Sequence, residues 1–123
     1  MCLRLRNQLF MAVRDIPYQI SSAKTDASCV AKTKLLGELL SRIGLQCQVW
    51  KAQVRWDAIG APPDLVSQAP RPTFNHFFLK VLIPETLRWV VVDATWDSRF
   101  QGSLPVNQWD GVSDTKLAYQ STQ

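Results

Sequence analysis

The hydrophobic positions near the start of the chain repeat at the spacing of a helix. Apolar side chains recur three or four positions apart within residues 3–18, at Leu5, Leu9, Ala12, Val13 and Ile16. This period is typical of an amphipathic helix. The helix is expected to end before Pro17, because the residue that precedes a proline is biased away from helical backbone.

A second helical pattern runs from Cys29 to Ile43 and is the clearest in the chain. Its apolar and small positions alternate steps of four and three, at Cys29, Thr33, Leu36, Leu40 and Ile43. Asp26 or Ser28 can cap its start, and Gly44 stands where a left-handed residue often ends a helix. The pattern predicts a helix over 29–43, preceded by a polar loop over 19–28.

After Gly44 the hydrophobic period changes from about 3.6 to 2, the period of a strand. Trp50, Ala52, Val54 and Trp56 alternate with polar residues. Residues 57–73 contain four prolines and one glycine and predict a long loop. Two further strands are expected at Phe74–Ile83 and Arg88–Thr95, joined by 84–87. The tail from Asp97 onward predicts a partly ordered extension, with Leu104, Val106 and Trp109 as packing points.

Composition agrees with a folded domain. The chain has 123 residues, of which 46% are hydrophobic and 20% charged, which excludes a disordered chain and fits one domain. No apolar run approaches the roughly 18 residues that a membrane span needs. The segment Met1–Arg6 is too short and too basic for a secretory signal. Helix, helix and then a meander of strands is an α+β plan.

The charge and the cysteine content restrict which binding partners and which cellular compartment are expected. The net charge is +4, and the basic residues are scattered rather than gathered in a stripe, so a nucleic-acid partner is not expected. The three cysteines Cys2, Cys29 and Cys47 are an odd number without CxxC spacing. This favours a reducing, cytoplasmic setting over a disulfide framework or a zinc site. We therefore expect no metal and no cofactor.

Cys29 is the first candidate for chemistry, because it stands in the first turn of the clearest helix. The unpaired amides and the dipole at a helix N-terminus favour a thiolate there. Lys32, one turn later, would add to this positive field if it faced the same way. The alternative is that Cys29 is a small buried apolar residue, since free cysteine is among the most buried residue types.

His76 is the only histidine, and Asp93 is its candidate partner. If the hairpin loop is centred between Pro84 and Glu85, these two residues lie directly opposite, with Cβ atoms about 4.5–5.5 Å apart. An aspartate in that position fixes the imidazole tautomer and stabilises the imidazolium. The alternative is a surface ion pair. Together with Cys29, the pair has the composition of a Cys-His-Asp nucleophilic site.

The motifs around these residues resemble bacterial transglutaminase-like domains. The similar segments are 14–18 before the catalytic helix, 28–32 at its start, 75–78 on the histidine strand and 92–97, the most specific of the four. The resemblance covers about residues 10–100 of a single domain, 1–123, and leaves 101–123 as a C-terminal extension. It implies a papain-like core, in which N-terminal helices pack on an antiparallel sheet, and a Cys29–His76–Asp93 triad. Members commonly carry glycine just before the cysteine, where this chain has Ala27 and Ser28.

The implied activity is thiol-dependent acyl chemistry on an amide or thioester, with a peptide or protein amide as the expected substrate. The thiolate would form a thioester that water or an amine resolves. The backbone N–H of Cys29 and a second donor from Tyr18, Gln19 or Trp50 would hold the oxyanion. The proline-rich loop is expected to rim the cleft. The alternative function is a catalytically inactive relative that uses the cleft for binding.

Overall fold

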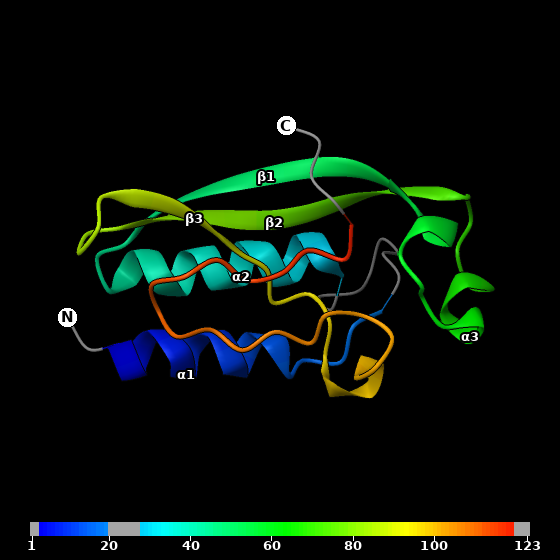
Figure 1. Ribbon diagram of the computed structural model, residues 1–123, viewed down its shortest axis with the longest axis horizontal. Coiled ribbons are helices and arrows are strands. Elements are labelled where there is room, and N and C mark those ends of the chain that lie inside the picture. The colour runs from blue at the N-terminus through cyan, green and yellow to red at the C-terminus, as the bar shows by residue number, and fades with distance from the viewer. Residues whose placement is uncertain (1–2, 20–27, 120–123) are drawn as a thin grey trace.

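The protein consists of two long helices beside a three-stranded antiparallel sheet (Figure 1), in a computed structural model that describes residues 3–19 and 28–119. The helices are α1 (Leu3–Arg14) and α2 (Cys29–Arg42). The strands β1 (Gln46–Arg55), β2 (Thr73–Ile83) and β3 (Arg88–Val92) lie in the order β1-β2-β3. Helix α2 packs on β1 and β2, and α1 packs on α2. The predicted α+β class is confirmed.

The predicted second helix is confirmed almost residue for residue. The Ser28 hydroxyl caps α2 by accepting from the backbone N–H of Ala31 at 3.3 Å. Gly44 follows the helix with a φ of +96°, a conformation that glycine adopts at little cost. Most of the predicted loop before the helix, including Asp26, lies outside the described residues. The first helix ends at Arg14, two residues earlier than its apolar pattern extends.

The main core lies between α2 and the inner face of the sheet. Leu36 and Leu40 of α2 meet a row of fully buried side chains on β2 and β3, which comprises Leu79, Val81, Ile83, Val90 and Val92. Gly37 allows the close approach, since a Cβ there would lie 3.3 Å from a Leu79 methyl carbon. The alternation on β2 and β3 therefore directs one face of the sheet toward α2.

The β2–β3 hairpin forms as predicted, but with a different register. Its loop is Pro84–Leu87, so Ile83 pairs with Arg88 and Leu79 pairs with Val92. The loop centre therefore lies one residue later than expected, and His76 and Asp93 are not directly opposite. Leu87 carries a positive φ of 57°, and the Glu85 carboxylate is held by Arg6 at 2.8 Å. Strand β3 ends at Val92 rather than at Thr95.

The proline-rich segment forms two short helices, η1 (Trp56–Ala58) and α3 (Pro63–Val66). They carry part of a second buried cluster of aromatic and apolar side chains, which includes Tyr18, Cys29, Trp56, Leu65, Trp96, Phe100 and Leu104. This cluster lies at the end of the sheet where α2 begins. A third short helix, η2 (Ser98–Phe100), closes it.

Residues beyond 100 contain no helix or strand in their described part, up to residue 119, but they are packed into the structure. The segment (Figure 1, orange to red) makes hydrogen bonds with α1, through Asn7 and Arg14, and with β3, through Val91. Leu104 and Trp109 are buried, whereas Val106 is partly buried. The Asn107 amide donates to the backbone oxygens of Asp93 (3.0 Å) and Lys116 (2.8 Å). The ordered chain therefore extends well past residue 100.

One buried cation connects the two long helices to the chain that follows β3. Lys32 is 1% exposed, and its ammonium donates to three carbonyl oxygens, those of Arg14 (2.9 Å), Ile16 (2.7 Å) and Thr95 (2.7 Å). Burial lowers the pKa of Lys32 to about 8, and the charges of three nearby carboxylates only partly offset this effect. Lys32 thus joins α2, the end of α1 and the chain after β3.

Replacing this cation should weaken the fold. We expect Lys32→Met to lower the free energy of unfolding by about 3 kcal/mol, because three carbonyls lose their donor and two of these hydrogen bonds are buried. Lys34→Met, on the exposed side of the same helix, should change it by less than about 0.5 kcal/mol. Urea unfolding followed by circular dichroism measures both. Equal effects of the two substitutions would contradict this role for Lys32.

Candidate active site

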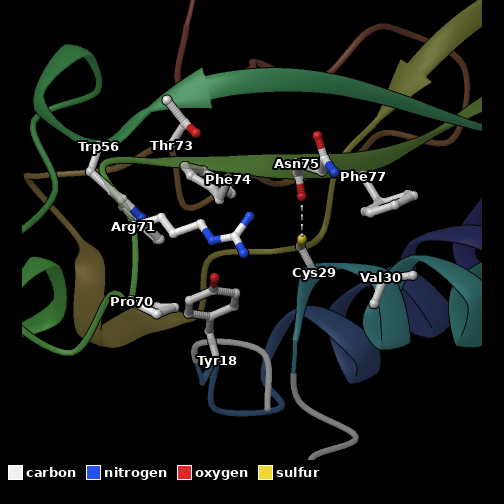
Figure 2. Close-up of a pocket in the computed structure, with 10 residues that line it drawn as sticks. All are labelled: Tyr18, Cys29, Val30, Trp56, Pro70, Arg71, Thr73, Phe74, Asn75 and Phe77. Atoms are coloured by element: carbon white, nitrogen blue, oxygen red, sulfur yellow. Dashed lines mark hydrogen bonds between the residues drawn. The ribbon is translucent and has the colours of Figure 1, made fainter. Parts of the chain in front are cut away.

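Cys29 lies where the first turn of α2 meets the edge of β2. Its Sγ is 3.5 Å from the backbone oxygen of Asn75 (Figure 2), and Thr33 donates from Oγ1 to the oxygen of Phe77 at 3.0 Å. The pairing of β2 with β3 stops at Leu79. Beyond that residue, the backbone oxygens of Asn75 and Phe77 are bound by side chains of α2 instead of by a strand. The local cause is the Ser28 cap, which starts the helix at Cys29.

His76 and Asp93 form a buried contact, although the register that predicted it is wrong. His76 Nε2 and Asp93 Oδ2 are 2.8 Å apart, and their side chains are 1% and 0% exposed. Continuing the observed register would place Asp93 opposite Phe78, two residues from His76. A shift of two residues keeps a side chain on the same face of a sheet, so the two side chains become diagonal neighbours and still meet. The contact is buried and not a surface ion pair.

The carboxylate of Asp93 is oriented by residues that the sequence did not single out. Its Oδ1 accepts from the backbone N–H of Thr95 (3.0 Å) and from the Thr95 hydroxyl (2.6 Å), which leaves Oδ2 for the imidazole. Its backbone N–H donates to Thr115 Oγ1 at 2.8 Å. Thr95 follows Asp93 by two residues, a spacing typical of local Asx hydrogen bonding that could have identified it. Thr115 gave no such signal.

The surroundings of His76 favour its protonated form. Burial, the largest single influence, lowers the pKa of His76, but the charge and hydrogen bond of Asp93 together with the nearby Cys29 thiol outweigh it and raise the pKa to about 10. His76 Nδ1 is buried and has no well-formed hydrogen bond with any described residue. The thiol is therefore close to the ring while its own hydrogen bond is directed to Asn75.

Aromatic rings enclose the imidazole. Trp96 stacks parallel to His76, with ring centres 5.9 Å apart and an angle of 4° between the planes, and Phe78 stacks at 6.2 Å. Phe74 and Tyr119 approach its edges. Such an enclosure keeps water from the His76–Asp93 hydrogen bond and so strengthens it. Trp96 belongs to the 92–97 motif, yet the sequence gave no reason to assign it to the site.

A pocket of about 270 Å³ opens beside Cys29. Figure 2 shows the thiol at its inner side and Tyr18 on the facing side. The proline-rich segment supplies part of the rim through Pro70 and Arg71, so the expectation that this loop lines the cleft agrees with the structure. The walls are largely aromatic, from Tyr18, Trp56, Phe74 and Phe77.

Of the three candidate second donors, the structure brings only Tyr18 to the Cys29 pocket. The Tyr18 backbone N–H is already bound to Asp97 Oδ2 at 2.6 Å, so its hydroxyl is the group that remains; burial and then the charge of Cys29 raise its pKa. Gln19 lines a neighbouring pocket together with Arg99 and Phe100. Trp50 lies on β1, where it is paired with Phe78 of β2, and its indole N–H donates to the Gln48 side-chain oxygen at 3.1 Å. It does not line the Cys29 pocket.

Comparisons with known proteins do not assign this chain to a family. No family model matches the chain, and no curated protein matches it significantly. Within residues 3–19 and 28–119, no group of three or more His, Cys, Asp or Glu side chains could hold a metal ion. The same residues include no helix that is long and apolar enough to cross a membrane. The geometry of the site is therefore the basis for any functional conclusion.

The raised pKa of His76 predicts an imidazolium that persists at pH 8 in the folded protein. Because this pKa lies above the ordinary 6.5, the protonated ring stabilises the fold fully below that pH, and the contribution is lost as the pH rises toward 10. In Asp93→Asn the pKa should fall, because burial is then unopposed by a carboxylate. NMR titration of the single histidine measures both, and an identical titration in the two proteins would contradict the contact.

Proposed function

We propose that this protein is an enzyme of the transglutaminase-like type with a papain-like core, which performs thiol-dependent acyl chemistry through Cys29, His76 and Asp93. The observation that carries the proposal is the buried 2.8 Å contact between His76 and Asp93, next to a cysteine at a helix N-terminus. The three residue types in this order along the chain match the nucleophile, the base and the residue that orients the base. The pocket beside Cys29 supplies room for a substrate.

The reaction begins from an ion pair, in which Cys29 is a thiolate and His76 Nδ1 already holds the proton. The thiolate then attacks the acyl carbon of an amide or thioester, and the carbonyl electron pair moves to oxygen. The N–H of Cys29, one of the unpaired donors in the first helical turn, and the Tyr18 hydroxyl would stabilise this oxyanion. The bond to the leaving amine or thiol breaks as His76 returns the proton to it, which leaves a thioester on Cys29.

The second half of the reaction reverses the roles. Water or an amine loses a proton to His76 as it attacks the thioester carbon, and Cys29 is released as a thiolate beside the protonated ring. Water gives hydrolysis and an amine gives transfer. Asp93 keeps Nε2 of the imidazole occupied throughout, so that Nδ1 carries the exchanged proton. The raised pKa of His76 suits the acid step, because the ring holds its proton at neutral pH.

A second candidate function is a binding domain without catalysis. The observation in its favour is that Cys29 is 5% exposed and that its sulfur is engaged with the Asn75 carbonyl rather than with Nδ1 of His76. In this alternative the thiol is an inert part of the buried aromatic cluster. The reactivity of the thiol distinguishes the two functions.

We expect Cys29 to react with iodoacetamide at pH 6 about 10- to 100-fold faster than a free thiol, because the imidazolium supports a thiolate there. Cys47 is a control within the same chain, since burial raises its pKa, and should react slowly. Peptide mass mapping against time measures the two rates separately. A Cys29 rate no higher than that of a free thiol would favour the binding domain.

Cys29→Ala should abolish acyl chemistry and leave the fold intact. With p-nitrophenyl acetate as the probe, we expect a burst of nitrophenolate and an acetylated Cys29 peptide in the unchanged protein and in Cys47→Ala. Neither signal should appear in Cys29→Ala, whose free energy of unfolding should fall by only about 1 kcal/mol. If Cys29→Ala unfolded the domain, the cysteine would be structural.

A further inference from the structure

Arg71 is the one charged Lys or Arg among the described residues that line the Cys29 pocket. Figure 2 shows its side chain extending across the pocket, with the guanidinium directed toward the Cys29 thiol. The side chain is exposed and makes no ion pair or hydrogen bond within the described chain, residues 3–19 and 28–119. An arginine held over a pocket without a counterion has five donors available to a ligand.

Three described acidic side chains near this end of the molecule already have partners. Asp57 pairs with Arg55 at 2.7 Å, and Asp97 pairs with Arg99 at 2.8 Å. Asp93 is buried against His76. No Asp or Glu lines the pocket among the described residues, and Arg71 is the only Lys or Arg among the described lining residues. Within residues 3–19 and 28–119, the pocket lining therefore carries one exposed basic side chain.

The remaining walls favour a flat or apolar group. Trp56 and Phe74 stack with ring centres 4.1 Å apart and an angle of 23° between them, and both line the pocket. The Trp56 side chain is itself part of the second buried cluster. A ligand that fits this pocket thus has an apolar part against the rings and a negative group at the guanidinium. The planar guanidinium matches a carboxylate in a two-point hydrogen bond.

We propose that Arg71 determines substrate specificity by binding a carboxylate of the acyl donor. The substrate class is then an amide or thioester that carries a free carboxylate beside an apolar group. This inference rests on the proposed function, because it assumes that the acyl carbon is presented to Cys29. It adds the charge of the substrate and assigns recognition to the proline-rich segment rather than to the triad.

The first test compares two alkylating agents that differ in charge. Iodoacetate carries a carboxylate and iodoacetamide does not, and both form the same bond to the Cys29 sulfur with loss of iodide. The ratio of the iodoacetate rate to the iodoacetamide rate should fall about three- to tenfold in Arg71→Gln. It should stay unchanged in Arg88→Gln, which removes an exposed charge at the distant start of β3.

The contribution of His76 to this ratio is common to all variants and cancels. Arg71→Lys keeps the charge without the planar fork and should retain most of the preference for iodoacetate, whereas higher salt should weaken it. A ratio that is the same in Arg71→Gln and in the unchanged protein would overturn the inference. Slow alkylation of Cys29 by iodoacetamide in the unchanged protein would instead contradict the proposed function, so the two failures are distinguishable.

The second test identifies the source of the carboxylate through protection of Cys29 from iodoacetamide. N-acetyl-phenylalanine represents a C-terminal carboxylate, and the α-amide of N-acetyl-glutamate represents a side-chain carboxylate. One of them should protect better than its uncharged amide counterpart, and Arg71→Gln should remove that advantage. Equal protection by charged and uncharged compounds in both pairs would overturn the assignment of a carboxylate to the substrate.

Discussion

The buried ammonium of Lys32 is the contact on which the site depends. Its three acceptors come from the end of α1, from the chain that follows it and from the chain after β3. These carbonyls face the interior, where each would cost free energy if left without a donor. Lys32 lies one helical turn after Cys29, so the residue that satisfies these carbonyls also holds α2 against the segment that contains Asp93 and Thr95.

The imidazole of His76 is governed by two opposing effects of the same burial. An apolar enclosure by Trp96 and Phe78 would by itself keep the ring neutral. The same enclosure strengthens the attraction of the Asp93 carboxylate, which is oriented by Thr95 and reaches Nε2 at 2.8 Å. The carboxylate prevails, and the pKa of His76 rises. A protonated ring in a dry cluster beside a thiol is the arrangement that thiol chemistry uses.

One wall of the pocket comes from a different part of the chain than the proposed triad. The residues of the proposed triad lie on α2, on β2 and directly after β3. The pocket wall with Trp56, Pro70 and Arg71 comes from the segment between β1 and β2. This division would allow the specificity of the pocket to change through the loop segment while the His76–Asp93 geometry stays constant.

The sequence alone determined the elements whose signals are local. The period of 3.6, the Ser28 cap and Gly44 predicted α2 closely, and the period of two predicted the antiparallel hairpin. The pairing of His76 with Asp93 was predicted for a partly wrong reason: the register differs by two residues, which changes the opposite neighbour but not the face of the sheet. The position of Cys29 at the helix start was likewise a local inference.

Only the tertiary structure decided which groups complete the site. Thr115 and Asn107 hold Asp93 from more than a dozen residues away, and Trp96 lies on His76 because the chain turns after β3. The same packing decided that, of the candidates Tyr18, Gln19 and Trp50, Tyr18 lines the Cys29 pocket. These contacts join segments distant in sequence, and their geometry follows from how helix, sheet and tail bury their apolar faces together. Hydrophobic periodicity specifies a face of each element but not the partner that covers it.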